Sequence, residues 1–273
     1  MTDPFKIIEP TVISFSGGRT SAYMLWRVLQ SNGGGLPSDA MVIFANTGKE
    51  EEATLKFVND CSVNWNVPIT WLEYTTNNDI QHKVVNYKTA SRKGEPFEML
   101  VDKFGYLPNP VSRICTAQLK IRTIHRYVRS LGIEHTENSD WMGIRADEPR
   151  RAAKVEKDRV PLYTAGITAQ DVGKFWSEHS FDLELPNMNG KTMHGNCDLC
   201  FLKGYQQIVS LVKEKPERAV WWANMESKMD NIITSGDGNR FRKDRMSYAS
   251  LMEYTQDQTD MFNDETIPCF CGD

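Results

Sequence analysis

The apolar and polar positions of the first 165 residues alternate between two kinds of segment. Short apolar, β-branched runs predict buried strands at residues 11–15, 40–45, 69–74 and 139–144. Longer stretches with apolar residues in helical spacing predict helices at residues 20–30, 50–64, 98–103 and 116–131. Strands that alternate with helices are typical of an α/β fold with a doubly wound, mostly parallel sheet. Ligands of such folds bind beyond the carboxyl ends of the strands.

The pattern changes after Arg159, where the strand signal fades. Helices are predicted at residues 168–179, 204–213, 217–230 and 246–255. We therefore expect a core of residues 1–165 and a helical, cysteine-containing region of residues 166–273 packed on it. The long connection of residues 77–113 is typical of a lid or a disordered linker.

Composition and charge narrow the function classes. The 273 residues carry a net charge of -4, which argues against a large nonspecific nucleic-acid surface but leaves a local basic patch open. No apolar run is long enough to span a bilayer. The first residues, Met1 to Pro4, lack the basic and apolar regions of a signal peptide. These features predict a cytoplasmic protein without a membrane partner; a homo-oligomer stays open.

A glycine-containing loop follows the first predicted strand, at Ser14-Phe15-Ser16-Gly17-Gly18-Arg19-Thr20-Ser21. A strand that enters such a loop and continues into a helix can surround an anion with backbone N–H groups, hydroxyls and the positive end of the helix dipole. The Gly-Lys-Ser/Thr ending of a Walker A loop is absent from it. The alternative is a turn that binds nothing.

Residues 16–21 resemble the PP-loop of N-type ATP pyrophosphatases and of the phosphoadenosine phosphosulfate (PAPS) reductase family. Four further segments resemble motifs of this family in the same order, at residues 42–50, 115–121, 143–151 and 161–172. Together the matches cover roughly residues 11–205. The resemblance implies an adenine nucleotide alpha hydrolase-like fold that binds ATP or a related adenine nucleotide. Asn46 departs from the pattern, because the family usually has Asp there.

The loop and the resemblance together define the expected site. The expected nucleotide-binding residues are Ser14, Ser16, Gly17, Gly18, Arg19, Thr20, Ser21, Asn46, Thr47, Gly48, Gly143, Arg145 and Arg150. A guanidinium suits phosphate or sulfate, so Arg145 is also a catalytic candidate, together with Lys120. Asp147 and Glu148 could hold Mg²⁺. For each of these charged residues except Arg145, a solvated surface charge is the alternative.

Five of the six cysteines are candidate metal ligands: Cys115, Cys197, Cys200, Cys269 and Cys271. The C-x-x-C pair can point two thiolates at one metal, and four of the five could complete a [4Fe–4S] or a zinc site. The resemblance favours the iron–sulfur cluster, which some members of the superfamily carry. Unligated cysteines are the third possibility. Cys61 is expected to be a buried small apolar residue on its helix.

Three functions fit this sequence. The first is an enzyme that cleaves ATP to AMP and pyrophosphate to activate an acceptor for sulfur transfer, where the acceptor is tRNA, DNA or a small molecule. The second is a PAPS or adenylylsulfate reductase, in which a Cys271 thiolate attacks sulfur and a thioredoxin-type reductant releases sulfite. The third is a noncatalytic, metal-stabilised module that binds a nucleotide.

Overall fold

The computed structural model describes residues 3–77, 79–136, 139–188, 191–192, 194–195, 197–233 and 238–262. The chain divides into two compact units. The first comprises Met1–Lys103 and Ile114–Asp198, and the second comprises Phe104–Arg113 and Leu199–Asp273. The boundary expected at residue 165 thus falls inside the first unit, because α7 (Ala169–Glu178) packs with α1 (Arg19–Ser31).

A five-stranded sheet forms the centre of the first unit, in the order β4-β3-β2-β1-β5. The strands are β1 (Thr11–Ser14), β2 (Ala40–Asn46), β3 (Ile69–Tyr74), β4 (His82–Val85) and β5 (Trp141–Met142). All neighbours pair in parallel except β3 and β4, which are antiparallel. Ser14 at the end of β1 pairs with Ile43 of β2 and with Met142 of β5. The expected α/β class with a mostly parallel sheet is therefore confirmed.

The connection of residues 77–113 is not a disordered linker in its described part, and its role as a lid stays a prediction. It contains β4, which extends the sheet, and the helix α3 (Glu95–Phe104). The buried Glu73 of β3 and Lys83 of β4 form a cross-strand ion pair of 2.8 Å between Oε2 and Nζ. Strand β4 lies at the edge of the sheet. Because its Val84 is 60% exposed, it lacks the buried apolar pattern that identified the other strands.

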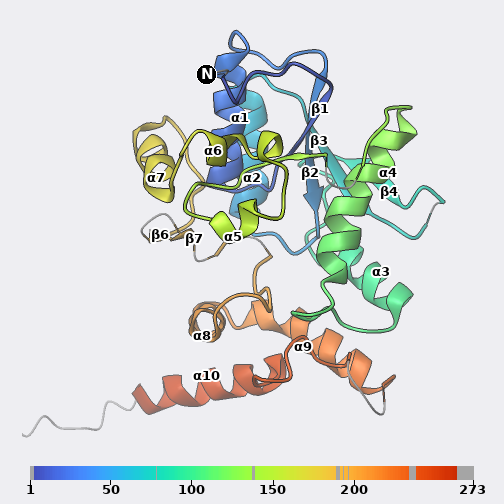
Figure 1. Ribbon diagram of the computed structural model, residues 1–273. Coiled ribbons are helices and arrows are strands. Elements are labelled where there is room, and N and C mark those ends of the chain that lie inside the picture. Colours follow the sequence, from blue (N-terminus) through green and yellow to red (C-terminus); the bar gives the residue numbers. More distant parts are fainter. Residues whose placement is uncertain are drawn as a thin grey trace, which may run out of the picture. The chain divides into compact units, whose positions relative to one another are not determined.

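Helices lie on both faces of the sheet (Figure 1). Successive strand residues point to opposite faces, so each strand supplies two cores. One face packs with α1, α7 and α2 (Glu52–Asn64) through Ile13, Val42, Phe44 and Trp71. The other packs with Ile124 and Val128 of α4 (Thr123–Ser130) through Val12, Ile43, Ala45 and Leu72.

The remaining elements of the first unit are short. The helix predicted at residues 116–131 begins as a π-helix, η1 (Cys115–Arg122), and continues as α4. After β5 the chain forms α5 (Pro149–Ala152), the 3-10 helix η2 (Lys157–Arg159) and α6 (Pro161–Thr164). Two antiparallel strands, β6 (Asn187–Met188) and β7 (Lys191–Thr192), follow α7.

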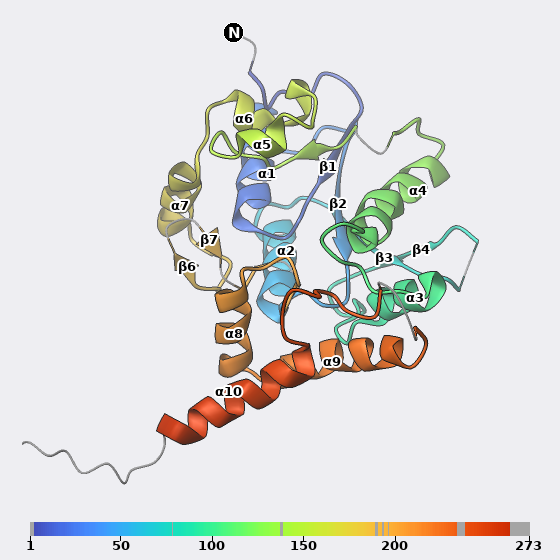
Figure 2. The same ribbon diagram turned by 60° about the horizontal axis from the view of Figure 1, so that its bottom comes forward.

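The second unit is built on three helices, α8 (Tyr205–Glu214), α9 (Glu217–Asp230) and α10 (Tyr248–Phe262), shown in Figure 2. Its core centres on the fully buried Trp222, whose ring lies 4.9 Å from that of Phe241 and 5.4 Å from that of Tyr248. In the described part of the chain, no helix has the length and apolar character needed to cross a membrane.

Candidate functional site

The loop between β1 and α1 has a backbone shape that requires glycine. Gly17 has a φ of +75°, and a Cβ atom on it would lie 2.7 Å from Cγ2 of Thr54. Gly18 is the N-cap of α1 and has no side chain to accept a hydrogen bond from the first turn. The first N–H groups of a helix have no partners within it. The loop therefore leads into a helix N-terminus that suits an anion.

Hydrogen bonds of two serines connect this loop to the first turn of α1. Ser16 Oγ donates to Ser21 Oγ at 3.0 Å, and Ser21 Oγ donates to the carbonyl of Gly18 at 2.9 Å. Ser16 is exposed, so its hydroxyl can turn towards a ligand without a change of the backbone.

The segment after β5 packs against the same helix turn. A Cβ atom on Gly143 would lie 3.0 Å from Cα of Ser21, so glycine permits this close approach. Arg145 then donates from Nη1 to Oγ1 of Thr20 at 3.1 Å. Two expected motifs that are far apart in the sequence thus meet at the carboxyl ends of β1 and β5.

The acidic residues beside Arg145 are bound to arginines. Arg145 Nε lies 2.9 Å from Oδ1 of Asp147, and this contact lowers the pKa of the Asp147 carboxyl. Glu148 forms ion pairs with Arg145 and Arg151. The two carboxylates therefore neutralise cations here, and a Mg²⁺ site at them stays a prediction. Arg150 is exposed on α5.

Arg19 is bonded within the protein. Its guanidinium binds the Asp182 carboxylate through two contacts of 2.7 and 2.6 Å, and it also donates to Thr192 Oγ1. Further bonds go to the carbonyls of Leu183 and Leu185. The side chain is only 8% exposed. These bonds connect the start of α1 to the segment after α7. The expected contact of Arg19 with a phosphate stays a prediction.

The turn after β2 is shaped by the fully buried Asn46. Its Nδ2 donates to Glu73 Oε1 at 2.6 Å and to the Ser91 carbonyl at 2.9 Å, while its Oδ1 accepts from Gly48 N at 3.1 Å. Gly48 has a φ of +79°. An Asp at position 46 would place two carboxylates in contact, so an amide suits this position.

Beside this turn, three expected site residues, Thr47, Lys120 and Cys197, gather around Glu50, which was not expected there. Thr47 Oγ1 donates to Glu50 Oε1 at 3.1 Å, and Lys120 Nζ lies 3.4 Å from the same oxygen. The sulfur of Cys197 lies 3.3 Å from Thr47 Oγ1. The second carboxylate oxygen of Glu50 is buried without a hydrogen-bond partner. In the sequence, Glu50 belongs to an acidic run at a helix start and ends the matching segment of residues 42–50, but it was not among the expected site residues.

Three of the five candidate metal ligands lie in the described part of the chain. Cys115 is half-buried at the start of η1, Cys197 is buried near the end of the first unit, and Cys200 belongs to the second unit. Cys269 and Cys271 lie outside the described residues. No three His, Cys, Asp or Glu residues gather as metal ligands within the described ranges. A [4Fe–4S] or zinc site at four of the five cysteines therefore stays a prediction.

Cys61 is fully buried on α2, as expected for a small apolar residue. Burial raises the pKa of its thiol, so it stays protonated and inert.

Comparison with known proteins gives a relative without an assigned activity. No family model matches the chain. The chain is similar to the uncharacterized nin region protein ORF290 of Escherichia phage lambda. The two are 28% identical over 251 residues, which cover 88% of this chain and 81% of the phage protein. The similarity therefore extends over most of both chains.

Proposed function

We propose that this chain is a PP-loop enzyme of the kind that the PAPS reductase family represents, with a doubly wound sheet. It binds ATP at the carboxyl ends of β1, β2 and β5. The observation that carries this proposal is the meeting of Gly143 and Arg145 with the first turn of α1. Four aligned parallel strands and a glycine loop beside that turn support it, because open α/β sheets bind ligands at this edge.

The proposed reaction cleaves ATP between the α- and β-phosphates. An oxygen of the acceptor attacks the α-phosphorus, the bond to the bridging oxygen breaks, and pyrophosphate leaves with the electron pair. The N–H groups at the start of α1 and the Arg145 guanidinium stabilise the charge that develops on the leaving group. Lys120 supplies a second cation at the edge of the site. A sulfur nucleophile then attacks the adenylated atom of the acceptor, the bond to the adenylate oxygen breaks, and AMP leaves with the electron pair.

The turn at residues 46–48 is the proposed adenine subsite. Backbone groups would contact the base there, and the bonds of Asn46 to Glu73, Ser91 and Gly48 hold that backbone in one shape. Glu50 contacts Thr47 of this turn, and Lys120 lies beside Glu50. The expected iron–sulfur cluster at four of the five candidate cysteines stays part of the proposal, and the steps above use none of these cysteines.

Calorimetric titration with ATP tests this proposal through Ser16. Ser16→Ala removes a hydroxyl from an exposed position, so we expect an intact fold and ATP binding weakened about tenfold or more, as for a lost bond to a charged group. Ser38→Ala is the matched control, because Ser38 is also exposed but lies in the loop before β2. Equal ATP affinity in wild type and both variants would contradict the proposed site.

Activity assays with adenylylsulfate, PAPS and ATP distinguish the proposed enzyme from the reductase and from the noncatalytic module. Turnover of either sulfonucleotide with a thiol reductant, and no pyrophosphate from ATP, would favour the reductase. Tight ATP binding without turnover in any mixture of nucleotide and acceptor would favour the noncatalytic module.

A further inference from the structure

The guanidinium of Arg145, which the proposed function assigns to the phosphates, is bound to a carboxylate of the same loop. Its Nε donates to Oδ1 of Asp147 at 2.9 Å, and its Nη2 donates to Oδ2 of Asp147 at 3.2 Å. Two parallel bonds of this kind are also how an arginine binds a phosphate. Asp147 therefore occupies one edge of the guanidinium that a phosphate would use.

The other edge of this guanidinium is held as well. A guanidinium has two edges that can make paired bonds, Nε with Nη2 and Nη1 with Nη2. Nη1 of Arg145 donates to Oγ1 of Thr20 at 3.1 Å and lies 3.4 Å from Oε2 of Glu148. A phosphate can therefore bind Arg145 through two hydrogen bonds only if one of these partners moves away.

Asp147 is the partner that can leave with the smallest loss. Its side chain is 41% exposed, so water can replace the guanidinium as its partner. Glu148 is 17% exposed, accepts from the backbone N–H of Arg145 at 3.1 Å and also pairs with Arg151. Thr20 belongs to the first turn of α1, which is part of the proposed phosphate site. The side chain of Asp147 is thus the one that a ligand can displace without loss of other contacts of the site.

The backbone on both sides of Asp147 is held by hydrogen bonds. The N–H of Ala146 donates to the carbonyl of Ile167 at 2.7 Å, and the N–H of Glu148 donates to the carbonyl of Arg145 at 3.1 Å. The carboxylate can therefore turn away from the guanidinium by rotation of its own side chain. The other partners of Arg145 keep the guanidinium at the start of α1 during this change.

Arg19 provides a contrast in the same part of the molecule. Its guanidinium also binds a carboxylate at two points, that of Asp182. It further donates to two backbone carbonyls, and its side chain is buried, whereas that of Arg145 is half-buried. Of the two arginine–aspartate pairs, the pair of Arg145 and Asp147 has fewer bonds to the fold and is the one that a ligand can open.

We propose that Asp147 and Arg145 form an autoinhibitory ion pair, in which the carboxylate competes with the phosphates of ATP for the guanidinium and turns away when ATP binds. This inference rests on the proposed function, because it concerns the same arginine. The Arg145 guanidinium holds the pKa of the Asp147 carboxyl below its usual range, so the competitor is charged at neutral pH. The pair thereby limits the affinity of the site for ATP.

Calorimetric titration of the full chain with ATP and Mg²⁺ tests the competition. Asp147→Asn keeps the size of the side chain and removes its charge, so ATP should bind about threefold or more tightly than to wild type. Asp147→Ser also removes the charge and should show the same gain if the first variant does not fold. Asp158→Asn is the matched control, because it makes the same charge change at an exposed residue that pairs with Arg159 and not with Arg145. Equal or weaker binding by the Asp147 variants, or an equal gain in the control, would overturn the proposal.

A double-mutant cycle shows whether Asp147 acts through Arg145. Arg145→Gln should weaken ATP binding about tenfold or more, and in this background Asp147→Asn should no longer strengthen it beyond the control. A gain of the same size as in wild type would assign the effect to general charge repulsion and overturn the proposal.

Failure of the nucleotide site is a separate result. If Ser16→Ala weakens ATP binding but Asp147→Asn binds ATP as wild type does, the site stands and the autoinhibitory pair is refuted. If neither wild type nor Asp147→Asn binds ATP, the proposed function fails, and the inference fails with it.

Discussion

Gly143 decides how closely the segment after β5 can approach α1. A methyl group there would lie 3.0 Å from Cα and 3.2 Å from N of Ser21, and both of these are backbone atoms that cannot rotate away. Gly143 permits this contact because it has no side chain. The sequence motif shows that a glycine is present but not which backbone atoms it approaches. The amide of Asn46 likewise depends on its surroundings, because it donates to the buried carboxylate of Glu73.

Gly143→Ala tests the close approach. We expect the variant to lose about 1–3 kcal/mol of unfolding free energy through overpacking and to bind ATP more weakly, because Arg145 moves relative to Thr20. Urea unfolding and calorimetry measure the two effects. Gly173→Ala is the control: no atom lies within 4 Å of the added methyl, and alanine favours helix α7, so its stability should rise slightly. An unfolding free energy and an ATP affinity of Gly143→Ala equal to those of the wild type would contradict the proposed contact.

The elements of the sheet centre follow closely from the sequence. Strands β1, β2 and β3 and helices α1, α2 and α9 lie where apolar runs and helical spacing predict them. Edge strand β4 was missed because its exposed Val84 breaks the buried pattern. Strand β5 has only two residues, since the chain turns at Gly143 to meet α1. Short elements such as β6 and β7 depend on tertiary contacts that periodicity does not record.

The start of α1 depends on Arg19 and its acceptors after α7. Arg19→Lys keeps the charge but cannot make the two-contact bond to Asp182 or satisfy the carbonyls of Leu183 and Leu185. We expect a loss of about 2 kcal/mol or more in unfolding free energy. Arg129→Lys, at an exposed position of α4, should stay within about 0.5 kcal/mol of wild type. A normal stability together with a large loss of ATP affinity would instead assign Arg19 to the nucleotide.

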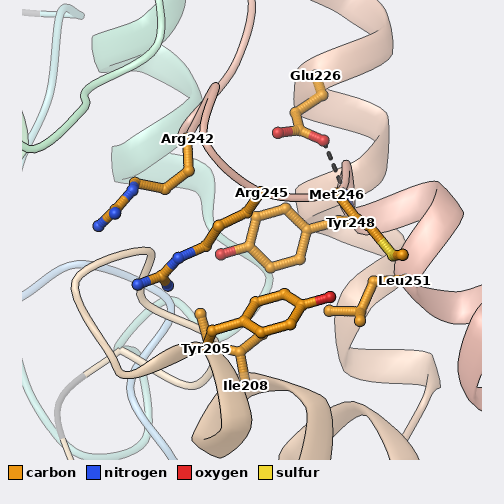
Figure 3. Close-up of a pocket in the computed structure, with 8 residues that line it drawn as sticks. All are labelled: Tyr205, Ile208, Glu226, Arg242, Arg245, Met246, Tyr248 and Leu251. Atoms are coloured by element: carbon orange, nitrogen blue, oxygen red, sulfur yellow. Dashed lines mark hydrogen bonds between the residues drawn. The ribbon is translucent and has the colours of Figure 1, made fainter.

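At the scale of the whole molecule, the two units differ in what they contain. The first unit gathers a glycine loop, a helix N-terminus and Arg145 at one edge of its sheet. The helices of the second unit surround a hollow of about 20 Å³, which has room for about one water molecule (Figure 3). The first arrangement was predicted in part, because its motifs have fixed spacing. The hollow was not, since Tyr205, Glu226 and Arg245 belong to different segments and only the packing of α8, α9 and α10 brings them together.

The most direct test of the central claim is a crystal structure of the protein with an ATP analogue that resists cleavage between the α- and β-phosphates. We expect phosphate oxygens within hydrogen-bond distance of backbone N–H groups of residues 17–21 and of Arg145. We also expect the adenine to lie against the turn of residues 46–48. An analogue bound elsewhere, or an empty loop at saturating analogue, would contradict the claim that this sheet edge is the nucleotide site.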